Sequence, residues 1–114
     1  MRTIEIRDET YEALTARAAL SGLDAPALVE ELIGSDVFEH GAIVKTPGIC
    51  GGDARIIGTR TPVWLVEQYR RFNGEAALAE RFPAIAPELW RAAIEYARLH
   101  SEEIEANLLE NAED

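Results

Sequence analysis

Arg91 and Arg98 are the two residues whose type and spacing best suit contact with DNA. They stand seven positions apart in a segment with apolar residues every three or four positions. On a helix this interval is about two turns, so both side chains can face one groove. A guanidinium group matches the edge of guanine and the oxygens of phosphate. Glu88 and Glu95 leave an alternative open, in which each glutamate pairs with an arginine on an ordinary helix surface.

Other arginines in the middle of the chain extend this set. Arg60 directly precedes Thr61-Pro62, which predicts a helix start, and the unpaired N–H groups there attract anions. Its alternative role is structural, with the guanidinium bonding to carbonyls of a tight turn. Arg55 and two adjacent arginines, at positions 70 and 71, supply the remaining basic character. The candidate DNA-binding residues are therefore Arg91, Arg98, Arg60, Arg70 and Arg71.

Catalysis and metal binding have no convincing set of residues. One cysteine and two histidines cannot complete a four-ligand zinc site within one chain. Cys50 and His40 are the only conceivable nucleophile and base, and nothing in the sequence places them together. The Gly51-Gly52 pair lacks the Gly-Lys-Ser/Thr of a nucleotide-binding loop and suits a hairpin turn. We expect no catalytic residues, no enzyme activity, no metal and no cofactor.

The charge of the chain is divided among three segments. Residues 1–44 hold three arginines against nine acids, a net charge of −6, and residues 45–98 hold eight bases against six acids, a net of +2. Residues 99–114 hold six acids and no base. The total of −10 disfavours a nucleic-acid binder, yet the basic middle can approach phosphate. The acidic flanks are either solvated surfaces or surfaces for a basic protein partner.

Apolar spacing and proline positions predict the helices that carry these arginines. A helix over Pro62–Phe72 should end at Asn73-Gly74. A second helix, Glu75–Phe82, should stop before Pro83, because the residue before a proline is disfavoured in the helical region. The turn Pro83–Ala86 and a helix from Pro87 then complete a candidate helix-turn-helix. The first of these helices should turn inward Leu65, Val66, Tyr69 and Phe72.

The last helix should continue from Pro87 as one element for more than twenty residues. A helix of that length exceeds what a small domain can cover. We therefore expect its C-terminal half to project or to pack on a partner. Its inner face should consist of Leu89, Trp90, Ala93, Ile94, Ala97, Ile104 and Leu108.

Short strands are expected before these helices. Ile43–Lys45 begins with β-branched residues and can pair with Arg55–Ile57 across the turn Pro47–Asp53. The preceding segment, Ser35–Ala42, is mostly polar and is expected to be a linker.

The first thirty-four residues predict one strand and two helices. Arg2–Arg7 alternates polar and apolar residues, Asp8–Ser21 changes to helical spacing, and Asp24 can cap a second helix. This order resembles the ribbon-helix-helix family of dimeric DNA-binding proteins, in which two chains pair their strands. Glu5 makes base recognition by this strand doubtful, because a carboxylate accepts only from cytosine. The resemblance implies a homodimer with contacts from Ile4, Ile6, Leu28 and Leu32.

Between Ile43 and Ile104 the chain carries, in this order, the motifs Gly51-Gly52, Gly58-Thr59-Arg60, Pro62-Val63, Asn73-Gly74, Arg81-Phe82-Pro83, Ala92-Ala93 and Tyr96-Ala97. These spaced motifs resemble the domain-of-unknown-function family 433. Members of this family look like VapB-like antitoxins, partners of PIN-type ribonuclease toxins, and carry a helix-turn-helix. The chain departs from the family pattern at Asp53-Ala54, where lysine and proline are common, and at Ala86, where a capping side chain is expected.

This resemblance implies an antitoxin of a type II toxin–antitoxin pair that binds a PIN-like toxin and represses its own operon by binding operator DNA. Acids of the C-terminal helix would then mimic phosphates in the basic cleft of the ribonuclease. These candidate toxin-binding residues are Glu102, Glu103, Glu105 and Glu110. The alternative is a protein-interaction or dimerisation module without DNA binding.

The expected fold is mainly α with short β. Residues 1–34 form a strand-helix-helix dimerisation segment, residues 35–42 a linker, and residues 43–114 a helix-turn-helix domain. This domain consists of a β-hairpin and three helices, the last of them long and acidic. The sequence contains no run of about 18 apolar residues, so we expect no membrane contact. Because no apolar signal-peptide core follows Met1, we expect a cytoplasmic protein.

Overall fold

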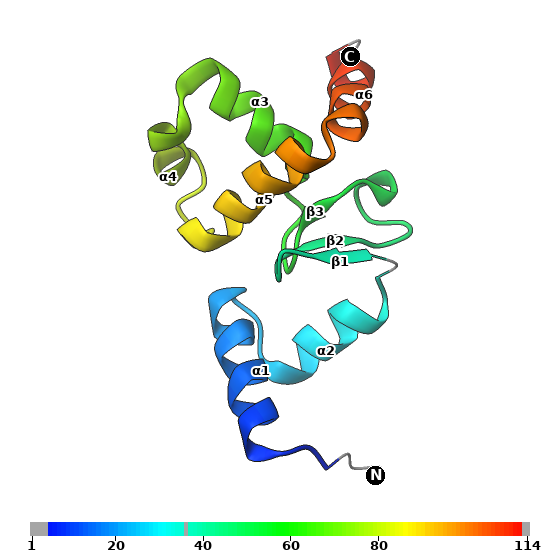
Figure 1. Ribbon diagram of the computed structural model, residues 1–114, viewed down its shortest axis with the longest axis vertical. Helices are drawn as coiled ribbons and strands as arrows, with labels where there is room; N and C mark the ends of the chain where they lie inside the picture. The colour runs from blue at the N-terminus through cyan, green and yellow to red at the C-terminus, as the bar shows by residue number, and fades with distance from the viewer. Residues whose placement is uncertain (1–4, 36, 113–114) are drawn as a thin grey trace.

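The computed structural model describes residues 5–35 and 37–112, and it shows a mainly helical chain with a small antiparallel sheet (Figure 1). Within these residues, no helix is both long and apolar enough to cross a membrane. The helices are α1 (Asp8–Leu20), α2 (Ala25–Ile33), α3 (Val63–Asn73), α4 (Leu78–Arg81), α5 (Pro87–Leu99) and α6 (Ser101–Ala112). The strands are β1 (Val37–Glu39), β2 (Ile43–Lys45) and β3 (Arg55–Ile56), and the short 3₁₀ helices are η1 (Cys50–Gly52) and η2 (Glu75–Ala77).

The sheet has the order β1-β2-β3, and the β2–β3 hairpin is the one that the sequence predicts. Ile43 pairs with Ile56, and Val44 pairs with Arg55. Strand β1 adds to the free edge of β2, with Glu39 opposite Ile43. The segment 35–42, predicted as a linker, therefore holds a strand. Polar composition concealed it, because a three-residue strand needs only an open edge to pair with.

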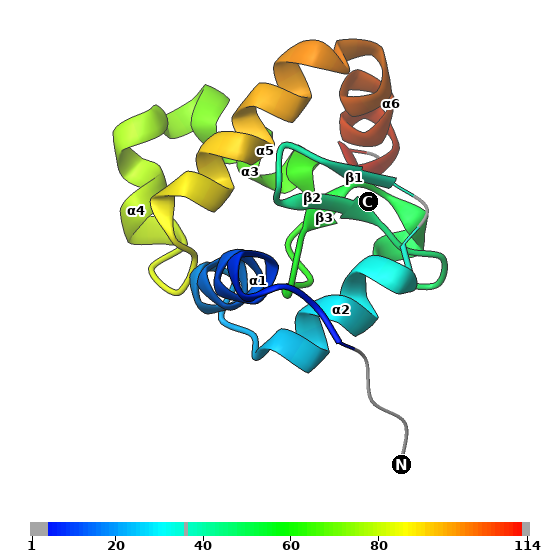
Figure 2. The same ribbon diagram turned by 60° about the horizontal axis from the view of Figure 1, so that its bottom comes forward.

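The sheet is covered on both faces, since alternate strand residues point in opposite directions. Ile43 and Ile56 join the larger hydrophobic cluster, which includes α3 and α5. Val44 joins a smaller cluster with Ala18 of α1 and Leu28 of α2. Figures 1 and 2 show α1 and α2 on one side of the strands and α5 on the other. The two N-terminal helices are thus packed on the sheet.

The predicted N-terminal strand is not present in its described part. Glu5, Ile6 and Arg7 belong to no strand, and the rest of that segment, including Ile4, lies outside the described residues. The two helices predicted after it are present as α1 and α2. Asp24 caps α2 as predicted, since its Oδ1 accepts a hydrogen bond of 2.8 Å from the Ala27 N–H.

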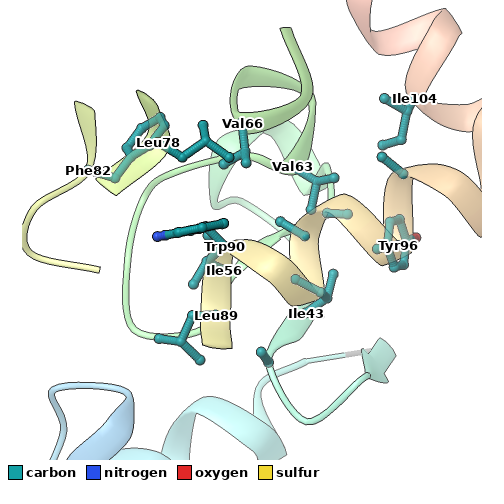
Figure 3. Close-up of a cluster of buried hydrophobic side chains, with 14 residues drawn as sticks. Ile43, Ile56, Val63, Val66, Leu78, Phe82, Leu89, Trp90, Tyr96 and Ile104 are labelled. Carbon is teal, nitrogen blue, oxygen red and sulfur yellow. The ribbon is translucent and has the colours of Figure 1, made fainter. Parts of the chain in front are cut away.

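Helix α5 lies at the centre of the larger cluster. Four of its buried residues are predicted ones, whereas Ile94 is only partly buried and Tyr96 takes its place. Figure 3 shows Trp90 in this cluster with Ile56, Leu78 and Phe82 around it. The buried residues of α5 are Leu89, Trp90, Ala93, Tyr96 and Ala97.

Helix α3 begins at Val63, one residue later than predicted, and ends at Asn73, because Gly74 after it has a φ of 87°, which glycine readily adopts. Val66 is buried as predicted. The prediction for Phe72 is wrong: it is 81% exposed, because the last turn of α3 extends beyond the core. Glu67 is buried in its stead.

The predicted single C-terminal helix is two helices, which are separated at His100. This residue has φ −118° and ψ 47°, and Figure 2 shows α6 turning away from the axis of α5. The His100 ring stacks on Tyr96, and its Nε2 lies 2.7 Å from a carboxylate oxygen of Glu39. The break brings α6 against α3, so Ile104 is buried instead of projecting. Helical periodicity contains no signal for these side-chain contacts.

Candidate functional site

The predicted helix-turn-helix segment contains a short helical stretch, a turn and a longer helix. Together η2 and α4 cover Glu75–Arg81, close to the predicted Glu75–Phe82. Residues 83–86 contain no helix, and α5 starts at Pro87 as predicted. Ala86 provides no side-chain cap. The order of a short helical stretch, a turn and a longer helix is therefore as predicted.

Arg91 and Arg98 both lie on the exposed face of α5. Their side chains are 60% and 66% exposed. Arg98 forms hydrogen bonds with Glu95 on the same helix, and these lower the pKa of Glu95. The Arg91 Nε lies 3.9 Å from a carboxylate oxygen of Glu75 in η2, and its guanidinium carbon lies 5.0 Å from the centre of the Trp90 ring. The alternative to DNA contact, in which the arginines pair with glutamates of the chain, is thus present. These ion pairs are weak because water and salt screen charges at the exposed surface.

Arg70 and Arg71 bind one buried carboxylate. The Arg70 Nε donates to Glu67 at 2.7 Å, and the Arg71 Nε donates to the other Glu67 oxygen at 2.8 Å. Burial by itself raises the pKa of Glu67, but the hydrogen bonds and the positive charges of Arg70 and Arg71 together outweigh it and lower the pKa. Arg71 also pairs with Glu105 of α6. Both arginines thus stabilise the α3 surface, and Arg71 also links α3 to α6.

The five candidate arginines do not share one surface feature. Arg70, Arg71 and Arg98 line a hollow of about 390 Å³ between α3, α5 and the start of α6. Arg91 is not among its lining residues, and Arg60 lies in the loop between β3 and α3. The predicted DNA-binding set therefore divides into a hollow near the C-terminal end of α5 and two separate positions.

The arginine that holds the β3–α3 loop is Arg55, not Arg60. Arg55 is 2% exposed, donates to the Thr59 carbonyl and to the Thr46 hydroxyl at 2.9 Å each, and pairs with Glu31 of α2. Arg60 is exposed, and its backbone carbonyl lies 3.4 Å from the Cys50 Sγ. Sequence reasoning missed this role of Arg55; its position in the short apolar run 54–57 was the available signal.

Some glutamates of α6 pair with residues of the same chain, and others are exposed to solvent. Glu103 accepts a hydrogen bond of 2.7 Å from Lys45 and one of 2.8 Å from the Tyr96 hydroxyl. Burial and the Glu103 carboxylate raise the pKa of Tyr96. Glu105 pairs with Arg71, whereas Glu102 and Glu110 are exposed. Two of the four candidate toxin-binding acids thus already have partners within the chain.

The candidate dimerisation residues lie in different environments. Leu28 is buried in the smaller cluster, and Leu32 packs against that cluster. Ile6, two residues before α1, is exposed, and Tyr11 on α1 is also exposed. A dimer contact in this region therefore has Ile6 and Tyr11 available at its surface, while Leu28 serves the core of the chain.

The potential nucleophile and base lie on separate loops. Cys50 is in η1 beside the Arg60 carbonyl, and the His40 ring is 6.4 Å from the Tyr96 ring. Within the described ranges, no three His, Cys, Asp or Glu side chains are grouped so that they could hold a metal ion.

Comparisons with known proteins place part of the chain near one family. Residues 43–97 match the family model described as "Protein of unknown function (DUF433)", which agrees with the resemblance drawn from the motifs. A crystal structure of a DUF433 member protein from Anabaena variabilis ATCC 29413 is similar, with 29% sequence identity and a TM-score of 0.57. The match covers 91% of this chain and 99% of that one. No curated protein matches the chain.

Proposed function

We propose that this chain, whose residues 43–97 match the DUF433 family model, is the antitoxin of a type II toxin–antitoxin pair. In this proposal α5 binds operator DNA in the cytoplasm and represses the operon, and α6 binds a PIN-like ribonuclease toxin. The observation that carries the DNA part is the exposure of Arg91 and Arg98 on α5, directly after a short helix and a turn. The toxin part rests on the charge of α6.

The exposed face of α5 supports contact with DNA because its ion pairs are easily exchanged. Glu75 and Glu95 hold Arg91 and Arg98 only at the water-exposed surface. Water and salt screen such pairs, so phosphate oxygens can replace the carboxylates at small cost. Each arginine that contacts phosphate also releases condensed counterions, which favours binding at low salt.

A DNA-binding measurement tests this part directly. Fluorescence anisotropy with the chain's own upstream DNA should show a complex that weakens as salt rises. Arg91→Ala and Arg98→Ala should each weaken it about fivefold or more. Arg7→Ala is the matched control, because Arg7 is exposed and lies just before α1, outside the helix-turn-helix segment. Absence of any complex with the wild-type chain at low salt would contradict the DNA part.

Helix α6 supports contact with a basic protein. It carries four glutamates and no basic residue, and Leu109 on it is exposed. Glu102 and Glu110 are exposed, whereas Glu103 and Glu105 pair within the chain. We therefore assign toxin contact to Glu102, Glu110 and Leu109, and the complementary charge favours a ribonuclease with a basic RNA-binding cleft.

Co-purification with the product of a neighbouring toxin gene tests this assignment. A Glu102→Lys, Glu110→Lys chain should lose the partner, because like charges would then meet in the interface. Glu12→Lys, an equivalent change on the exposed surface of α1, should retain it. A partner that remains bound after both α6 changes would rule out α6 as its binding surface.

The expected homodimer has support in the exposed apolar side chains near the start of α1. Ile6, just before the helix, and Tyr11 on it are both exposed. Two copies of the chain would bury these side chains against each other in a symmetric contact. Light scattering should give the mass of two chains, and Tyr11→Glu should give the mass of one. A wild-type chain that remains monomeric would exclude this contact.

The alternative function, a protein-interaction or dimerisation module without DNA binding, is favoured by one observation. Arg91 and Arg98 each have a glutamate neighbour in the chain, so surface ion pairing accounts for both. A chain that binds its partner protein but no DNA would establish this alternative.

A further inference from the structure

Two basic residues between positions 45 and 98 differ from the rest. Lys45 and five of the arginines each pair with a glutamate. In the part of the chain that the structure describes, Arg60 and Arg81 have no carboxylate partner. Both are exposed, so their positive charge remains available to an anion from outside the chain.

Aromatic rings hold Arg81 without neutralising it. Its guanidinium carbon lies 4.9 Å from the centre of the Phe82 ring and 5.9 Å from that of Tyr69. A ring face orients the guanidinium plane but accepts little of its charge, unlike a carboxylate. The N–H edge therefore remains free to donate two parallel hydrogen bonds to a phosphate.

Two hollows meet at the loop that contains Gly58 and Thr59. The larger, of about 450 Å³, is lined by Arg81, by the turn between α4 and α5, and by Ser21 and Gly22 at the end of α1. The smaller, of about 280 Å³, is lined by Arg60, Leu23, Glu31 and Ile49. Gly58 and Thr59 line both. Figures 1 and 2 show the α4–α5 turn beside this end of α1.

Close packing fixes the wall between the hollows. Gly58 has φ +75°, and a Cβ at this position would meet the Ser21 carbonyl oxygen at 2.9 Å. The Thr59 hydroxyl donates to the Ile56 carbonyl at 2.8 Å and accepts from the Thr61 N–H at 3.1 Å. Arg55 holds the Thr59 carbonyl. A ligand therefore meets a preformed surface, which lowers the entropy cost of binding.

We propose that Arg60 and Arg81 bind backbone phosphates of a nucleic acid on either side of the Gly58–Thr59 loop. The inference rests on the DNA-binding function proposed above, and it adds the surface that positions the nucleic acid. The α4–α5 turn lines the larger hollow and leads directly into α5, so one backbone can follow both. Glu31, the acid in the smaller hollow, is already paired with Arg55 and repels phosphate less than a free carboxylate.

The test measures by fluorescence anisotropy the affinity of each variant for two duplexes, the upstream DNA and a scrambled sequence. The double variant Arg60→Ala, Arg81→Ala is compared with the control Arg7→Ala and with the double variant Arg91→Ala, Arg98→Ala. Loss of phosphate contacts in the Arg60, Arg81 double variant should weaken binding to both duplexes equally, by about tenfold. The slope of the logarithm of the binding constant against the logarithm of the salt concentration should fall in magnitude by about 0.9 for each lost contact. Arg60→Lys, Arg81→Lys should restore most of the affinity, because it keeps the charges. Circular dichroism melting verifies that each variant is folded.

The outcomes separate this inference from the function on which it rests. If the Arg60, Arg81 double variant binds like Arg7→Ala while the Arg91, Arg98 double variant is weakened, the phosphate surface is wrong and DNA binding by α5 stands. A variant that loses only the upstream duplex and still binds the scrambled one also contradicts a phosphate role. If the wild-type chain binds neither duplex, both proposals fail.

Discussion

The two faces of the sheet are buried by different chemistry. Toward α5, Ile43 and Ile56 lie in a continuous apolar cluster of fourteen buried residues. Toward α1 and α2, four buried apolar residues form the cluster among the side chains that the structure describes, and Arg55 lies beside Val44 with its charge directed to Glu31. One face therefore depends on hydrophobic burial, and the other on a small cluster and a buried ion pair.

The two faces therefore have different roles: the face toward α5 mainly stabilises the fold, and the face toward α1 and α2 mainly fixes the position of the elements packed on it. Apolar burial stabilises by about 25 cal/mol for each Å² removed from water, so the larger cluster contributes most of the free energy of folding. A buried ion pair contributes little net free energy, but removing one partner is costly. Arg55 also donates to the Thr59 carbonyl. Its main effect is thus to hold α2 and the Gly58–Thr59 loop in register with the sheet.

The largest effect is expected from Ile56→Ala, which leaves a cavity in the larger cluster. Ile56 is fully buried, and such truncations cost about 3–4 kcal/mol. Urea unfolding should show a lower midpoint with an unchanged slope, in one transition. A loss below about 1 kcal/mol would mean that this face does not dominate the stability.

Arg55→Ala should cost about 2–3 kcal/mol, because it leaves Glu31 and the Thr46 hydroxyl without their donor. An apolar replacement of the pair, Arg55→Met with Glu31→Leu, should recover most of this loss. The free energy of unfolding of the two single variants and of the double variant measures the coupling. Simple additivity of the two changes would show that the ion pair has no special role.

Leu28→Ala should cost about 2 kcal/mol, at the lower end for a buried leucine, because its cluster is small. Hydrogen exchange should become faster in α1 and α2 while α3 and α5 keep their protection. Ala93→Gly on the opposite face is the comparison variant, and it should speed exchange in α5. Equal acceleration in all helices after Leu28→Ala would show that the two faces unfold as one unit.

The smallest effect is expected from Glu67, which lies at the polar border of the larger cluster. Arg70 and Arg71 hold its pKa below the ordinary value of 4.5. The folded chain therefore binds this proton more weakly than the unfolded chain, so the stabilisation is present above pH 4.5 and is lost as the pH falls below it. Glu67→Gln should lower the free energy of unfolding at pH 7 by less than about 1 kcal/mol. This difference should shrink as the pH falls below 4.5 in a pH series of urea unfolding curves.

Local signals predicted the elements well. Pro83, Pro87 and Gly74 mark helix bounds that the structure confirms to within a residue or two, and Asp24 caps α2. The β2–β3 hairpin follows from its β-branched residues and its glycine turn. The motif resemblance agrees with the family match over residues 43–97. Each of these features depends on a few neighbouring residues, so the sequence carries the information directly.

The errors concern features with distant partners. Strand β1 forms because the edge of β2 is open to it, and the helix breaks at His100 where Glu39 and Tyr96 bind its ring. Phe72 has helical spacing that points it inward, yet its turn lies past the core. In each case the predicted and the observed structure differ in contacts with distant parts of the chain, which the local sequence does not contain.

The sequence by itself determined where several helices begin and end, because φ restriction by proline, positive φ at glycine and capping by a side chain act within one turn. Only the tertiary structure decided what the charged residues do. Lys45 meets Glu103, and Arg71 meets Glu105, across 58 and 34 positions of the chain. Charges at such distances pair only after the core has packed, and among the described residues that packing gives Arg60 and Arg81 no carboxylate partner.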